Sequence, residues 1–156
     1  MTIWHNPADG TLHDDMDGAA LNLPAWPQGM VEATAEQINP PLTIAEAQAA
    51  KLASIAADFQ AAANAGVTDA GGAVWNGGFE SAQAIYGAAQ LAQAGGAATV
   101  EIFDASNAGH QLTIAQATAV AATVGAAYQA AFAKYQGLKV QIAAATTVAA
   151  VQAIVW

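Results

Sequence analysis

Alanine constrains this chain more than any other residue, because 45 of its 156 residues are alanine. Alanine favours helix since it loses no side-chain entropy there, yet each one buries little apolar area. A core made of alanine depends on close backbone approach rather than on large side chains. Charged residues make up only 10% of the sequence, against roughly 25% in typical soluble domains. We therefore expect part of the helical surface to be buried against other subunits.

The charge balance limits the class of partner. The formal net charge is −9, with three lysines and no arginine. Nucleic-acid binding needs basic side chains that neutralise phosphates, so we expect none. Membrane insertion is not expected either. The longest uncharged helical stretch, residues 114–133, is rich in alanine and contains glutamine and threonine, whereas a membrane helix carries more Leu, Ile, Val or Phe.

The first 42 residues differ from the rest, because they hold all five prolines of the chain, including the Pro40-Pro41 pair near their end. Residues 3–13 read as a hairpin with Asp9-Gly10 at its turn. Residues 23–29 are expected to form a turn-rich connector. Because the residue before a proline avoids the helical region, Asn39-Pro40-Pro41 predicts a boundary. We expect an N-terminal hairpin and linker module over residues 1–42 and a helix-rich domain over residues 43–156.

Helices and short hairpins alternate in the second part. Thr43 with Glu46 predicts the start of a long helix that stops at Gly66. The glycine pairs Gly71-Gly72 and Gly77-Gly78 suggest a hairpin over residues 74–79. Ser81 is expected to cap a second helix that ends near Gly95. Strands are expected at residues 99–103 and 110–112. The fold class is therefore α+β, helix-dominated.

The longest helix is expected to begin at Thr113, which forms a capping-box pattern with Gln116, and to break at residues 145–147 before a last short helix. Its apolar stripe is broad enough to lie either at the centre of the domain or against another copy of the chain. The residues assigned to a subunit interface on this basis are Val120, Val124, Ala127, Tyr128, Ala131, Phe132, Tyr135 and Trp156.

Few residues suggest chemistry. His5, His13 and nearby aspartates could bind a divalent metal if a hairpin brought the imidazoles together, and Asp15-x-Asp17-Gly18 resembles a fragment of a calcium loop. A solvated acidic turn explains the same residues, so we expect no metal and no cofactor. His110 stands beside a turn, and the sequence has no Gly-x-Ser-x-Gly motif that would supply a nucleophile. No catalytic residues are therefore expected. Trp75 and Phe79 could stack on a sugar ring, but packing in the core or at an interface explains them better.

The capped alanine-rich helix and the C-terminal ending carry a resemblance to a known group of proteins. Its pattern matches three parts of the chain. These are residues 49–55 (Ala-Ala-Lys-Leu-Ala-Ser-Ile), the helix start at Leu112-Thr113, and the ending from Ile142 through Thr146-Thr147 to Trp156. Over residues 40–156 the chain resembles an alanine-rich domain family of tail-fibre and tail-fibre-associated proteins of tailed bacteriophages. The chain departs from that pattern in having few charges in its middle region.

This resemblance implies a non-enzymatic structural component of a phage tail, at the tail fibre, tail tip or baseplate. Such a protein is made in the host cytoplasm, becomes part of the virion and contacts other phage tail or fibre proteins. Phage fibres are typically three-fold, so the resemblance also implies a homo-oligomer, most simply a trimer. A tail-fibre assembly chaperone and a sugar-binding adhesin of the tail are the alternatives.

Overall fold

A computed structural model describes residues 2–15 and 29–156 of the chain. The chain divides into two compact units, Met1–Thr43 and Ile44–Trp156. The architecture is mixed, with long helices and short antiparallel strand pairs, which confirms the predicted helix-dominated α+β class. Residues 16–28 include most of the predicted connector and the calcium-loop fragment at Asp17-Gly18, which therefore lie outside the described residues.

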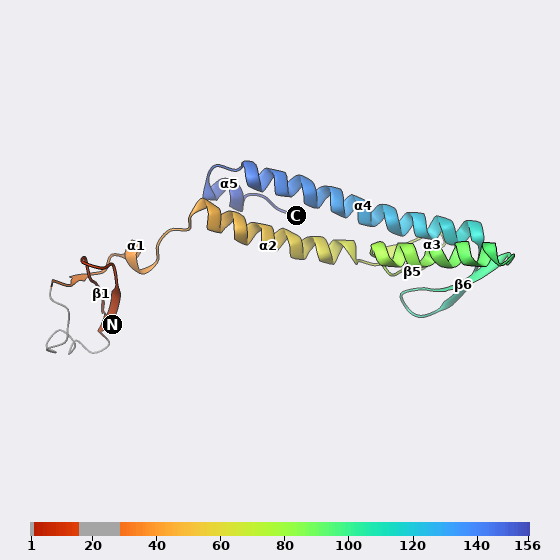
Figure 1. The fold of residues 1–156 in the computed structure, drawn as a ribbon, viewed down its shortest axis with the longest axis horizontal. Helices are drawn as coiled ribbons and strands as arrows, with labels where there is room; N and C mark the ends of the chain where they lie inside the picture. The colour runs from red at the N-terminus through yellow and green to blue at the C-terminus, as the bar shows by residue number, and fades with distance from the viewer. Residues whose placement is uncertain (1, 16–28) are drawn as a thin grey trace. The chain divides into compact units, whose positions relative to one another are not determined.

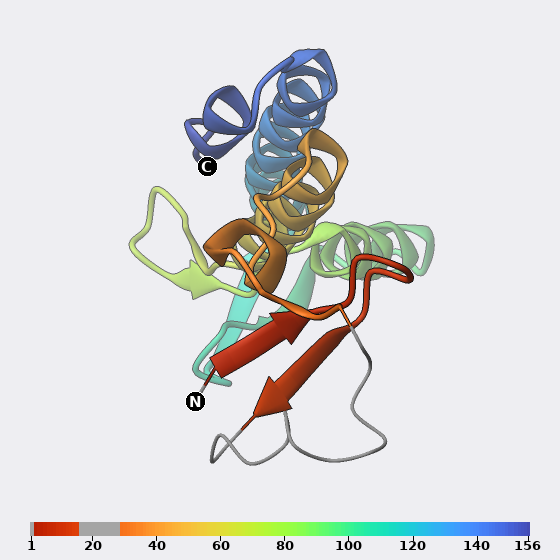
Figure 2. The same cartoon turned by 90° about the vertical axis from the view of Figure 1, so that its left-hand side faces the viewer.

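The first unit is a small antiparallel sheet with the strand order β2-β1-β3. Strand β1 (Thr2–His5) pairs with β2 (Leu12–Asp15), shown in red in Figure 2, and the predicted hairpin is confirmed. The Asp9 carboxylate closes the turn by accepting the backbone N–H and the hydroxyl of Thr11, at 2.9 and 2.7 Å. Strand β3 (Val31–Glu32) pairs with the other edge of β1 and was not predicted.

The register of this hairpin separates its two histidines. His13 pairs with Trp4, whereas His5 pairs with Leu12. Because side chains alternate between the faces of a strand, His5 and His13 point to opposite sides of the sheet. The hairpin therefore does not bring the imidazoles together, and the idea of a metal site that uses both is wrong. A short helix, α1 (Ala35–Ile38), follows β3 and starts with a Thr34/Gln37 capping box.

Four helices form the frame of the second unit. Helices α2 (Ile44–Ala63) and α3 (Phe79–Ala94) lie one after the other along the much longer α4 (Ile114–Ala144), as Figure 1 shows. At 1.5 Å per residue, the 31 residues of α4 span about 46 Å. Helix α5 (Val148–Gln152) turns back from the end of α4 and packs on α2. Thr113 and Gln116 form the predicted capping box at the start of α4.

Two hydrophobic clusters follow one another along α4. The first joins α3 to the N-terminal half of α4, with Trp75 and Ile102 against buried alanines. The second joins Ile55 of α2 to Leu138 and Ile142 of α4, and the C-terminal residues Ile154 and Trp156 pack on it. Small side chains dominate the first cluster, so the helix backbones approach closely there.

Two short hairpins accompany the first cluster. Strands β4 (Val67–Thr68) and β5 (Val74–Trp75) form one hairpin, and β6 (Thr99–Phe103) and β7 (Gly109–Thr113) form the other. The second hairpin was predicted. The prediction of a hairpin over residues 74–79 is wrong. The turn lies upstream, at residues 69–73, and Gly77-Gly78 lead directly into α3.

The N-terminus of α3 also differs from the prediction. Helix α3 begins at Phe79, and its N-cap is Gly78, with φ +99° and no capping side chain. Ser81 is inside the first turn and is not the cap. Gly77 is needed for a different reason, because a Cβ atom there would lie 2.1 Å from the carbonyl oxygen of Ala65, two residues after the end of α2. None of the helices in the described part of the chain has the length and apolarity required to span a membrane.

Candidate functional site

The most elaborate polar arrangement of the second unit begins at Asp69, in the turn between β4 and β5. Its Oδ1 atom accepts the backbone N–H groups of Gly71 and Ala73, at 2.8 and 3.1 Å. Its Oδ2 atom accepts the indole N–H of Trp75 at 2.8 Å. The bond from Trp75 and the backbone N–H groups hold the pKa of the Asp69 carboxyl below its ordinary value, since all of them favour the charged form.

Asp104 occupies the matching place in the turn between β6 and β7. Its Oδ1 atom accepts the backbone N–H groups of Ser106 and Ala108 and the Ser106 hydroxyl, at 2.8, 3.0 and 2.7 Å. Its Oδ2 atom lies 2.9 Å from Nε2 of His110. The Ser106 and His110 bonds lower the pKa of the Asp104 carboxyl far below its ordinary value of 3.8.

The two turns have the same hydrogen-bond pattern. In each, an aspartate accepts the backbone N–H groups two and four residues ahead and the ring N–H six residues ahead. The third residue after the aspartate has positive φ in both, at Gly72 (+86°) and Asn107 (+63°). The sequence carries this repeat as Asp-Ala-x-x-Ala, at residues 69–73 and 104–108, with an aromatic or imidazole ring two residues later.

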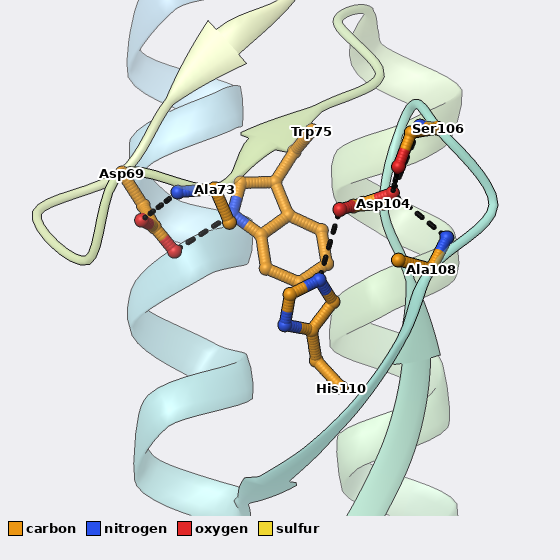
Figure 3. A network of polar contacts seen from close by, with 7 residues as sticks. All are labelled: Asp69, Ala73, Trp75, Asp104, Ser106, Ala108 and His110. Atoms are coloured by element: carbon orange, nitrogen blue, oxygen red, sulfur yellow. Dashed lines mark hydrogen bonds and ion pairs between the residues drawn. The ribbon is translucent and has the colours of Figure 1, made fainter.

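The two turns also contact each other. The rings of Trp75 and His110 lie 5.1 Å apart between centroids, and the Ala105 N–H donates to the carbonyl of Val74 at 2.8 Å. Figure 3 shows the indole between the Asp69 carboxylate on one side and the Asp104–His110 pair on the other. A groove of about 430 Å³ runs beside these rings, and Leu112, Gln116 and Thr123 form part of its wall.

This network joins the two hairpins of the second unit. A carboxylate only accepts hydrogen bonds, so Nε2 of His110 carries the proton that bonds Asp104. The Ser106 hydroxyl donates to the same carboxylate and not to His110, so the pair does not activate a serine. Trp75 is only 1% exposed, so its ring is part of the core and cannot stack on a sugar.

The stripe assigned to a subunit interface lies on the side of α4 that faces its own domain. Val120 and Val124 are buried in the first cluster, against α3. Tyr135 and Trp156 pack on the second cluster. The interface assignment is therefore corrected for Val120 and Val124, because the chain's own side chains bury both. Tyr135 and Trp156 are half-buried, so their assignment stays a prediction. Tyr128 and Ala131 are half-buried, and only Ala127 and Phe132 of the assigned set are exposed.

The opposite side of α4 carries a second stripe, whose residues are all exposed. Its residues recur every three or four positions, so they share one face along the whole helix. The sequence from residue 114 to residue 144 contains two lysines and no acid. We call this stripe the outer face of α4, and its members are Ala115, Ala119, Ala122, Ala126, Ala130, Ala133, Gly137, Val140 and Ala144.

Each of the three lysines contacts another group of the second unit. Lys51 donates to the carbonyl of Gln152 at the end of α5, at 3.1 Å. Lys134 lies over the Trp156 ring at 4.7 Å from its centroid, and Lys139 lies 5.4 Å from the Tyr135 ring. These contacts fasten the C-terminal segment and the end of α4 to the domain.

The sequence pattern of a domain of unknown function (DUF4376) matches residues 46–155, which covers nearly the whole second unit. No curated protein and no solved structure matches the chain. The chain therefore belongs to the DUF4376 family.

Proposed function

We propose that this chain is a structural, non-enzymatic component of a bacteriophage tail, at the tail fibre, tail tip or baseplate. The observation that carries the packing role is the outer face of α4, an alanine-rich stripe whose residues are all exposed. The assignment to a phage tail comes from the resemblance of residues 40–156 to domains of tail-fibre proteins.

The outer face suits close packing against another long helix. Alanine lets helix axes approach to the lower end of the usual range of about 8–10 Å. The stripe extends along about 46 Å of helix, so a partner helix has a long contact line. Interfaces of standard size bury about 1,200–2,000 Å² of surface. Side chains on the flanks of α4 would add to the area that the stripe buries.

The charge distribution favours a second copy of the same chain as the occupant. Copies with a net charge of −9 repel one another wherever their acids meet. Helix α4 has no acid, and its two lysines lie over aromatic rings. Contact through this helix therefore keeps the carboxylates apart. Closed symmetry is the usual arrangement of identical subunits, and the three-fold symmetry of phage fibres makes a trimer the proposed state.

The composition of purified phage particles tests the virion role. Particles of the phage that encodes this chain are expected to contain it at a fixed ratio to the fibre protein, measured by quantitative mass spectrometry. An assembly chaperone would instead be abundant in infected cells and missing from the particles. That result would refute the structural role and favour the chaperone.

A further inference from the structure

A second cavity, distinct from the groove beside Trp75, lies where α2 ends and α3 begins. Its volume is about 330 Å³, which falls at the lower end of the range of about 300–1,000 Å³ for small-molecule sites. Phe79 and Tyr128 form an aromatic wall, and Gln60, Asn64, Glu80 and Ser81 supply polar groups. The cavity therefore combines ring faces with amide, carboxylate and hydroxyl groups.

The paired glycines before α3 create this cavity. A side chain at Gly77 would collide with the carbonyl of Ala65, and one at Gly78 would lie 2.9 Å from Oδ1 of Asn64, in a positive-φ conformation that side chains rarely adopt. The glycines let the end of α2 and the start of α3 meet closely. As a result, Phe79 begins α3 beside the polar end of α2, and its side chain is 46% exposed.

The aromatic wall is held from behind. The Phe79 and Tyr128 rings lie 5.5 Å apart between centroids and are inclined by 39°. Tyr128 in turn contacts buried Phe59 at 6.0 Å and Phe132 at 6.2 Å. Two rings at an angle, one of them widely exposed and both supported by further rings, offer a firm apolar surface to a flat ligand.

The polar groups suit hydroxyl groups rather than anions. The Asn64 Nδ2 atom donates to the carbonyl of Gln60 at 2.9 Å, which fixes the amide. The cavity wall contains the carboxylate of Glu80 and no cation, because the three lysines are engaged at Gln152, Trp156 and Tyr135. An acidic sugar or a phosphate would meet a negative charge without compensation.

We propose that this cavity binds a neutral sugar unit of a glycan, with the apolar face of the sugar ring on Phe79 and Tyr128 and its hydroxyl groups at Asn64, Glu80 and Ser81. The proposal adds a ligand to the packing role and does not depend on it. The site lies at the joint of α2 and α3, whereas packing uses the outer face of α4, so either can fail alone.

Saturation-transfer NMR on the full chain tests this site, with D-glucose, D-galactose, N-acetyl-D-glucosamine and D-glucuronate as separate probes. At least one neutral sugar should receive saturation at its ring C–H protons, and glucuronate should receive much less. Phe79→Ala and, independently, Asn64→Ala should each weaken binding about tenfold, while folding is checked by circular dichroism. Phe103→Ala, which removes an exposed ring elsewhere in the second unit, is the matched control and should leave binding unchanged.

Three results would overturn the proposal. The first is the absence of transfer to all three neutral sugars. The second is equal transfer to glucuronate, which would contradict the argument from charge. The third is binding that persists in both folded variants, Phe79→Ala and Asn64→Ala, because the sugar would then occupy another place.

Discussion

Overpacking at the contact between α3 and α4 distinguishes the two sides of the long helix. Ala117 of α4 and Ala89 of α3 are fully buried in the same cluster, with Val124 also fully buried beside them. Replacing Ala117 with leucine adds three carbon atoms where side chains and backbones are already in contact. Such an insertion costs about 1–3 kcal/mol of unfolding free energy.

The same substitution at Ala127 is the matched control, because Ala127 lies on the same helix but is exposed. Exposed substitutions of this kind change stability by about 0.5 kcal/mol or less. At about 4 °C per kcal/mol for a domain of this size, Ala117→Leu should lower the melting temperature by about 4–12 °C and Ala127→Leu by about 2 °C or less. Thermal unfolding followed by circular dichroism at equal protein concentration measures both. Equal melting of the two variants, or a larger loss for Ala127→Leu, would refute the assignment of the faces.

Three further predictions concern turns and caps. Gly77→Ala should lower the free energy of unfolding by about 3 kcal/mol, because its Cβ would meet the Ala65 carbonyl. Gly87→Ala, with open space around it, should stabilise α3 by up to about 1 kcal/mol. Urea unfolding measures both. Thr113→Ala removes the capping box of α4 and should cost about 1 kcal/mol in the same assay. The lowered pKa of Asp104 stabilises the fold above the ordinary value of 3.8, and this contribution is lost as the pH falls below it. Melting temperatures between pH 6 and pH 2 should therefore fall less steeply for Asp104→Asn than for the unmodified chain. Equal slopes would contradict a stabilising role of the hydrogen bonds to Asp104.

Local sequence signals predicted most of the elements. The Thr113-x-x-Gln116 pattern marked the start of α4, because a hydroxyl and an amide three residues apart satisfy the first backbone N–H groups of a helix. Alternation over residues 99–103 and the turn after it marked the β6–β7 hairpin. The same reasoning failed at residues 74–79, where paired glycines suggested a turn. Those glycines permit a close approach between helices, which is a tertiary requirement that has no local signal.

The direction of the α4 stripe could not be deduced from periodicity. Val120 and Val124 mark one face by their size, and both are buried in the first cluster. Whether a neighbouring element or another copy covers it depends on where α3 and α2 pack. Because alanine occurs on all sides of α4, the outer face has no hydrophobic contrast to distinguish it.

The twin aspartate turns were missed for a different reason. Each carboxylate bonds a ring six residues ahead, beyond the spacings used to recognise turns. The repeated Asp-Ala-x-x-Ala pattern, at residues 69–73 and 104–108, was the available signal. Comparing the two loops with each other, rather than with standard turn types, would have revealed it and would have linked His110 to Asp104.

The mass of the full chain in solution, measured by sedimentation equilibrium at micromolar concentration, tests the packing role most directly. A trimer of the 15.6 kDa chain, about 47 kDa, is expected. Ala126→Glu puts a charge in the middle of the outer face of α4 and should reduce the mass to that of one chain. Ala57→Glu, on the exposed side of α2, should leave the trimer intact. A monomeric unmodified chain, or a trimer that survives Ala126→Glu, would contradict packing through this face.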